Sequence, residues 1–146
     1  MLSLLVACGS TKQELELIMH STNRLNLTEG GQPSPLVVRI YILRFKDRFH
    51  QSTFKEMWKR DSEVLGDGLI RRMDMTLKPD DEHIVEMTAD QEKEENYIGI
   101  MGLFRKHIPN MWRMLIPIEE PGFFSFGTPE VKLRFDENSL RPFDDD

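Results

Sequence analysis

Apolar and polar residues alternate along several short segments of this 146-residue chain, and that period of two limits most strongly how it can fold. Val131, Leu133 and Phe135 alternate with charged neighbours. The same period runs from Leu69 to Leu77, where methionine and leucine recur on one face. Successive side chains of a β-strand point to opposite faces, so the pattern predicts strands with one buried face.

Three further segments are apolar on both faces, which predicts strands that are covered on both sides. They run over residues 36–45, 97–104 and 111–118. Shorter strands are expected at residues 14–20 and 84–87, the second after a turn-forming stretch. The chain therefore reads mainly as short strands joined by turns.

One segment breaks the period of two. Within residues 49–60, Phe54, Met57 and Trp58 fall at positions i, i+3 and i+4, on one face of a helix. Thr53 and Glu56 are spaced as a capping box. This segment predicts a short helix inserted among the strands. We therefore predict an all-β fold, a two-sheet β-sandwich of about seven or eight strands with a short inserted helix.

Several single residues give more local expectations. Gly99 and Gly102 lie inside an expected strand and indicate a bulge or a close backbone approach. Pro117 is expected at a sheet edge or at the end of its strand. Both tryptophans, Trp58 and Trp112, are expected in the core.

The single cysteine, Cys8, follows a short apolar start and precedes Gly9 and a polar stretch. Branched apolar residues, a small residue and then cysteine form the pattern that a lipoprotein signal peptidase cleaves, and the thiol takes up the diacylglycerol. The alternative is a buried thiol in a first strand. A complete signal has a basic start and about 7–15 apolar residues. We interpret residues 1–7 as the remnant of a longer signal that starts upstream, and Cys8 as the lipidated residue.

Charge and composition exclude several classes of function. A net charge of −6 argues against binding to nucleic acid or to anionic lipid headgroups. No apolar run approaches the roughly 18 residues of a transmembrane helix. One cysteine permits no internal disulfide. A covalent lipid is therefore the expected route to a membrane.

The residues that could carry catalysis or bind a metal form no recognisable set. The four histidines lack the spacing of zinc ligands. His83 lies near Asp80 and Asp81, but a charged turn is the more common arrangement of such residues. We predict no catalytic residue, no metal and no small-molecule substrate. The aromatic segment at residues 123–126 either folds over a sheet edge, which we favour, or forms an exposed contact patch.

An ordered series of motifs covers the chain from Cys8 to about Phe135. After the cysteine and an early strand come Ser34-Pro35-Leu36-Val37-Val38-Arg39-Ile40-Tyr41-Ile42-Leu43, a helical segment at 49–58, Leu65-Gly66-Asp67, and a strand running into Pro79. Then come Tyr97-Ile98-Gly99-Ile100-Met101-Gly102-Leu103-Phe104-Arg105 and Trp112-Arg113. This series resembles the TssJ-type outer-membrane lipoproteins of type VI secretion systems. The chain departs from that pattern in its shortened signal and in Asp80, where the family usually has glycine after proline.

The resemblance implies a transthyretin-like sandwich without catalysis, and no cofactor besides a covalent lipid on Cys8. It implies three parts, a signal remnant (1–7), a lipidated tether (8–13) and the sandwich domain (14–146). It places the protein at the periplasmic face of the outer membrane, where Gly9 is permissive for export. The implied partner is the periplasmic domain of the inner-membrane subunit TssM, and through it the inner-membrane subunit TssL.

In that family the loop between the first two strands makes much of the contact with TssM. Here the loop spans about residues 25–35, with apolar residues followed by two glycines. The implied partner-binding residues are Leu25, Asn26, Leu27, Thr28, Glu29, Gly30, Gly31 and Gln32. From the residues alone, an ordinary hairpin connection is the simpler interpretation.

Two other functions remain open from the sequence. One is a generic soluble β-sandwich binding module with no lipid anchor. The other is a small hydrolase, because one enzyme family shares the transthyretin-like fold. That family ends in Tyr-Arg-Gly-Ser, whereas this chain has Ser139-Leu140-Arg141-Pro142-Phe143 near its end.

Overall fold

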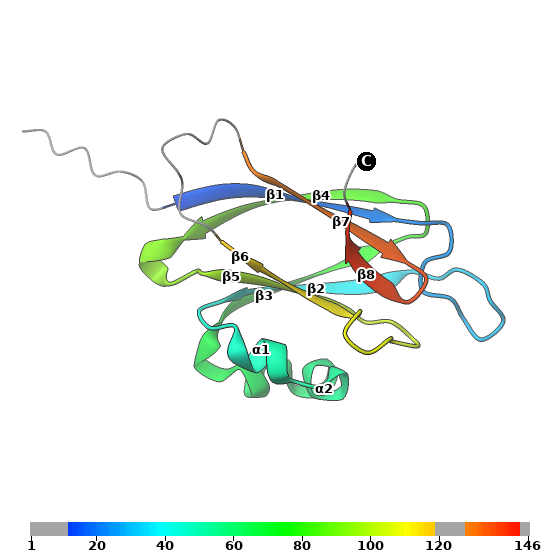
Figure 1. The fold of residues 1–146 in the computed structure, drawn as a ribbon, viewed down its shortest axis with the longest axis horizontal. Helices are drawn as coiled ribbons and strands as arrows, with labels where there is room; N and C mark the ends of the chain where they lie inside the picture. The colour runs from blue at the N-terminus through cyan, green and yellow to red at the C-terminus, as the bar shows by residue number, and fades with distance from the viewer. Residues whose placement is uncertain (1–11, 119–127, 144–146) are drawn as a thin grey trace, which may run out of the picture.

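Two packed sheets of four strands each form the fold in the computed structural model, which describes residues 12–118 and 128–143 (Figure 1). The strands are β1 (Lys12–Ser21), β2 (Leu36–Leu43), β3 (Leu69–Leu77), β4 (Glu82–Asp90), β5 (Tyr97–Gly102), β6 (Arg113–Pro117), β7 (Glu130–Asp136) and β8 (Ser139–Pro142). One sheet has the order β4-β1-β7-β8 and the other β3-β2-β5-β6. The predicted two-sheet sandwich is confirmed.

The first sheet is organised around β1, which pairs antiparallel with β4 and parallel with β7. Leu15, Leu17 and Met19 are buried on its inner face, as the period of two requires. The strands predicted at 14–20, 84–87 and 131–135 are confirmed, and each extends further. The four-residue strand β8 carries too short a pattern to have been assigned from the sequence.

The second sheet has β2 between β3 and β5. Ile40 and Ile42 face the sheet-to-sheet core, while Tyr41 and Leu43 lie on the opposite face, and all four are at most 1% exposed. Helices cover that outer face (Figure 1), which explains why the segment is apolar on both sides. The edge strand β6 ends at Pro117, as expected.

Two helices and two short 3₁₀ turns interrupt the strands. The helices are α1 (Asp47–Gln51) and α2 (Phe54–Leu65), and the turns are η1 (Gly66–Gly68) and η2 (Gln91–Lys93). The single helix predicted at residues 49–60 is thus two helices, separated at Ser52 and Thr53. The predicted capping box is confirmed: Glu56 N donates to Thr53 Oγ1 at 3.1 Å, and Thr53 N donates to Glu56 Oε2 at 2.9 Å.

Gly99 lets α1 lie close against β5. A Cβ atom at this position would come within 2.8 Å of Cε2 of Phe49, so only glycine leaves room for the buried phenyl ring. The expected close backbone approach is therefore confirmed. Trp112 is 4% exposed and lies in the core as predicted.

The prediction for Trp58 is wrong, because this side chain is 52% exposed. The buried residues of α2 are Met57, Asp61 and Leu65, and the helix is kinked between the first two of them, at Arg60, where φ is −151° and ψ is 46°. One residue further along the helix turns the side chain by about 100°, away from the sheet. Trp58 therefore faces solvent, beneath the ammonium group of Lys59 at 5.5 Å from the ring centroid.

Two sequence interpretations fall outside the described residues, namely the lipidation of Cys8 and the placement of the aromatic segment at 123–126. Among the helices in the described part of the chain, none is long and apolar enough to cross a membrane.

Candidate functional site

The loop between β1 and β2, residues 22–35, extends beyond one end of the sandwich (Figure 1). The first strand begins at Lys12 at the other end and runs for ten residues towards the loop. At about 3.3 Å per residue, that strand separates the two ends by roughly 30 Å. The loop therefore lies at the end of the molecule remote from the point where the described chain begins.

Asn26 fixes the base of this loop. Its Nδ2 donates to the carbonyl oxygen of Pro35 at 2.9 Å, and its Oδ1 accepts from Arg105 N at 2.9 Å. Its own backbone N–H donates to the carbonyl of Glu137 at 2.7 Å. The residue is 3% exposed and has a φ of 48°, a left-handed conformation that asparagine tolerates better than most residues. Asn26 thus joins both arms of the loop to two other connections.

Ser34 completes the base from the other arm. Its backbone N–H donates to the carbonyl of Leu25 at 3.0 Å, and its hydroxyl donates to the carbonyl of Asn26. The Leu25 side chain is fully buried in the core. Leu25 and Asn26, both predicted contact residues, therefore support the loop from below and are not available to a partner in this conformation.

The tip of the loop carries the remaining six predicted residues. Thr28 N donates to the carbonyl of Gln32 at 2.8 Å, and Gly31 N donates to the carbonyl of Thr28 at 2.9 Å. Gly31 has a φ of +77°, which favours glycine. Leu27 and Thr28 are half-buried, and the other four, Glu29, Gly30, Gly31 and Gln32, are exposed. The tip is thus a closed turn that presents a small polar surface beside one partly exposed leucine.

The turn between β7 and β8 supports the loop from the side. The hydroxyl of Thr22 donates to Asp136 Oδ1 at 2.6 Å, and Arg24 pairs with Glu137 at 2.5 Å. The second contact joins two side chains that are at least 45% exposed, so it contributes little to stability. Together with Asn26, these bonds give the loop a fixed direction.

A separate polar network holds α2 on the outer face of the second sheet. Asp61 Oδ2 accepts from the hydroxyl of Tyr41 at 2.9 Å, from Arg72 at 2.7 Å and from Arg39 at 3.4 Å. Arg39 also donates to the carbonyl of Met57 at 2.9 Å. The carboxylate side chain is 8% exposed. This network was not anticipated from the sequence, although an arginine within the apolar strand at 36–45 was a usable signal.

Burial and neighbouring charges shift the pKa values of Tyr41 and Asp61 in this network. Burial raises the pKa of Tyr41, and the Asp61 carboxylate raises it further against a bond from Arg39 that lowers it. Burial alone would raise the pKa of Asp61, but the hydrogen bonds from Arg72 and Tyr41 hold it below its ordinary value. At neutral pH Asp61 is therefore a carboxylate and Tyr41 a neutral phenol that donates to it, and the geometry of the network serves to dock the helix.

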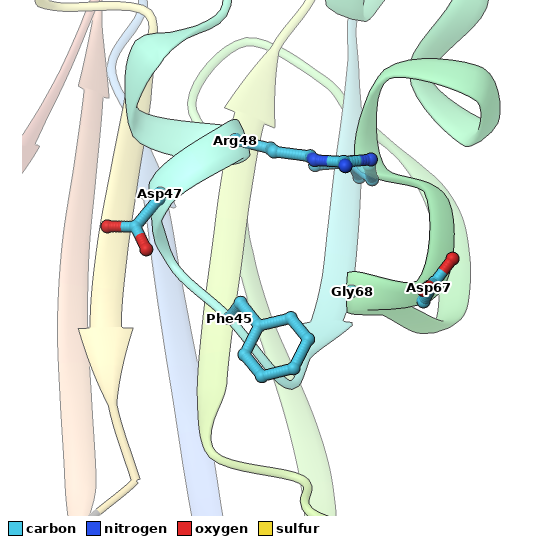
Figure 2. Close-up of a pocket in the computed structure, with 6 residues that line it drawn as sticks. Phe45, Asp47, Arg48, Asp67 and Gly68 are labelled. Atoms are coloured by element: carbon cyan, nitrogen blue, oxygen red, sulfur yellow. The ribbon is translucent and has the colours of Figure 1, made fainter.

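A small pocket lies between the start of α1 and η1 (Figure 2). Its volume is about 180 Å³, and it is lined by Phe45, Asp47, Arg48, Leu65, Asp67 and Gly68. Figure 2 shows the Arg48 side chain reaching from α1 towards the wall that carries Asp67. Ligand pockets usually enclose about 300–1,000 Å³, so we assign no small-molecule site here. Within the described residues, no group of three or more metal-ligating side chains is placed to hold a metal ion.

Comparison with known proteins gives one family and one fold. The family described as type VI secretion lipoprotein, with VasD, EvfM and TssJ, matches residues 13–138. No curated protein matches the sequence significantly.

Solved structures share the fold at low identity. Lip of Serratia marcescens, a membrane-bound component of the type VI secretion system, superposes with a TM-score of 0.81 at 22% identity, over 91% of this chain and 97% of that one. The type VI lipoprotein TssJ1 of Pseudomonas aeruginosa gives 0.77 at 20% identity, over 90% and 98%. A chain in a structure of the TssM C-terminal domain from EAEC gives 0.76 at 24% identity, over 88% and 99%.

Proposed function

The chain belongs to the family of type VI secretion lipoproteins, and from this membership we propose that it ties the periplasmic domain of TssM to the outer membrane. The observation that carries the proposal is the family match over residues 13–138, nearly the whole sandwich. A similar chain is part of a structure of the TssM C-terminal domain, which supports TssM as the partner. Through TssM the protein connects indirectly to TssL. It acts by binding alone, without a catalytic step.

The membrane attachment proceeds through a lipid on Cys8. In this proposal residues 1–7 are the remnant of the signal and the tether starts at Cys8; the expected end of the tether at residue 13 moves back, because β1 of the sandwich already begins at Lys12. Gly9 after the cysteine is permissive for export, which puts the protein at the periplasmic face of the outer membrane. Each buried CH₂ contributes about 0.8 kcal/mol, so several acyl chains make a durable anchor where one does not.

The lipid step is tested by labelling with radioactive palmitate in cells that express the gene with its upstream codons. Wild type is expected to incorporate label, and Cys8→Ala is expected to incorporate none. An unlabelled wild type removes the anchor from the proposal, and the protein then becomes the soluble binding module that the sequence left open.

The tether and the β1–β2 loop lie at opposite ends of the sandwich, which supports docking at the loop end. The tether precedes β1 at one end of the sandwich, and the loop tip lies about 30 Å away along that strand. A partner that approaches from the inner membrane would meet the loop end first. The contact residues are those of the tip, from Leu27 to Gln32, and the buried Leu25 and Asn26 hold the tip in place.

The contact is tested in a pull-down of the periplasmic domain of TssM with this purified protein. Leu27→Asp, or deletion of residues 27–31, is expected to weaken the complex while the thermal unfolding temperature stays near that of wild type. Lys93→Glu is the matched control, because this exposed residue lies in η2 at the other end of the sandwich. Undiminished capture of both loop variants would move the contact to another surface.

A further inference from the structure

The connection between β5 and β6, residues 103–112, lies at the same end of the sandwich as the β1–β2 loop (Figure 1). The two loops are bonded to one another. Arg105 N donates to Asn26 Oδ1 at 2.9 Å, and Arg105 Nε donates to the hydroxyl of Ser34 at 3.3 Å. The residues that fix the base of one loop therefore also fix the position of the other.

The β5–β6 loop is held on its remaining sides as well. The ring of His107 stacks on Phe54, with 4.0 Å between centroids and an interplanar angle of 6°. At the end of the loop, Leu140 N donates to the carbonyl of Met111 at 2.7 Å, and Gly102 N donates to the carbonyl of Trp112 at 2.9 Å. Helix, strand and neighbouring loop thus hold this segment in one shape, which lowers the entropic cost of binding.

The surface of this loop differs from that of the chain as a whole. Residues 105–110 are exposed, and Ile108 presents 41% of its surface to solvent. The loop contains Arg105 and Lys106 but no aspartate or glutamate, in a chain with a net charge of −6. Within the described residues neither cation has a carboxylate within ion-pair distance, whereas Arg24 at the same end is paired with Glu137.

We propose that the β5–β6 loop is a second contact for the partner that binds the β1–β2 loop. It receives an acidic segment of that partner, with carboxylates facing Arg105 and Lys106 and an apolar side chain against Ile108. Charge complementarity argues for the acidic character, because the two cations are exposed and neither has a carboxylate partner among the residues that the structure describes. Continuity with the β1–β2 loop argues for a shared partner, because three hydrogen-bonding residues, Asn26, Ser34 and Arg105, join the loops. The inference rests on the proposed docking function.

The test measures the affinity of the full chain for the periplasmic domain of TssM, at low and at high NaCl concentration. Lys106→Glu and Ile108→Ser are the test variants, since neither side chain has a bond to the loop base. Lys93→Glu and Ile84→Ser are the matched controls, because Lys93 is exposed and Ile84 is 51% exposed on β4, an edge strand of the sheet that does not carry the β5–β6 loop. Leu27→Asp reports on the β1–β2 loop separately.

We expect Lys106→Glu to raise Kd about three- to tenfold at low salt and to reduce its salt dependence, as for a charge at an interface rim. Ile108→Ser is expected to raise Kd by about the same factor at all salt concentrations, because an apolar contact is not screened. Both controls are expected to bind as wild type does. Wild-type affinity of both test variants, alongside weak binding of Leu27→Asp, overturns the second contact and leaves the docking function intact. A wild-type chain that fails to bind overturns both.

Discussion

Asn26→Ala tests whether one buried side chain holds the proposed docking loop in place. The substitution removes the donor to the Pro35 carbonyl and the acceptor for Arg105 N. It also puts alanine at a φ of 48°. Both former partners belong to exposed residues and can be rehydrated, so each lost bond costs about 1 kcal/mol, near the centre of the usual range. The left-handed backbone adds about 1 kcal/mol for alanine.

The expected loss is therefore about 3 kcal/mol in the free energy of unfolding, a large share of the ~5–15 kcal/mol that stabilises a domain. Urea denaturation followed by tryptophan fluorescence measures it directly. Asn26→Asp is the matched variant, because it keeps the acceptor for Arg105 and tolerates the backbone conformation but loses the donor. At neutral pH we expect this variant to lose more than about 1 kcal/mol, because its carboxylate is buried and one of its oxygens faces the Pro35 carbonyl oxygen.

The same two variants separate stability from docking. Asn26→Ala is expected to weaken the complex with the periplasmic domain of TssM at a temperature where the variant is still folded, because the tip loses its fixed direction. A loss of stability within about 0.5 kcal/mol of zero, the size of a neutral surface change, would refute the reasoning. It would mean that the loop keeps its shape without the amide.

Three further changes test the packing of the helical layer. Asp61→Asn leaves Arg39 buried without its charge partner and is expected to cost about 2–4 kcal/mol at pH 7 in chemical denaturation, somewhat below the value for a fully buried pair. The folded-state pKa of the Asp61 carboxyl is depressed. Its contribution to stability is therefore present above its unfolded pKa of about 3.9 and is lost as the pH falls through the folded value. The difference in free energy of unfolding between variant and wild type should close in acid, and a difference that stays constant contradicts the assignment. Gly99→Val is expected to displace Phe49 and lower the thermal unfolding temperature by several degrees, with about 1–3 kcal/mol lost to overpacking; an unchanged transition in calorimetry would show that the ring can move freely. Thr53→Ala removes the capping box and is expected to cost about 1 kcal/mol in urea, and no measurable change would mean that the helix end is held by packing alone.

The strands of the sandwich were predictable because their alternation reports directly on burial. Leu69 to Leu77 was assigned with the observed bounds. Apolar residues on both faces correctly indicated a strand covered on both sides for β2, which has the other sheet on one side and helices on the other. The same expectation was wrong for residues 111–118, because β6 is an edge strand that is only partly buried. The strand β8 was missed as a separate element because only one of its four residues, Leu140, is a buried hydrophobic side chain.

Trp58 shows where residue types mislead. The buried face of α2 includes Asp61, a charged residue that a hydrophobic pattern cannot count as buried. Its burial depends on Arg39 and Tyr41, which lie about 20 residues away in the sequence. The sequence alone does not show that Asp61 has these partners, so Trp58 was the better candidate for the buried face of the helix. Long-range pairing decides the phase of this helix.

The position of the β1–β2 loop was predictable from the sequence, but not which of its residues are buried and which are exposed. Leu25 and Leu27 look alike in the sequence, yet Leu25 is fully buried and Leu27 is only half-buried. The difference follows from Asn26, whose partners include Arg105, 79 positions further along the chain. A contact of that range leaves no local signal. The β5–β6 loop was passed over for the same reason.

Hydrogen exchange of the complex with the periplasmic domain of TssM tests the central claim most directly, since it locates the contact without any substitution. The account predicts slower amide exchange at residues 27–32 on complex formation, and unchanged exchange in η2 and at the end of β4 that leads into it, which pairs with the start of β1. Protection confined to β4 or to the helical layer, with the loop tip exchanging as in the free protein, would contradict docking through the β1–β2 loop.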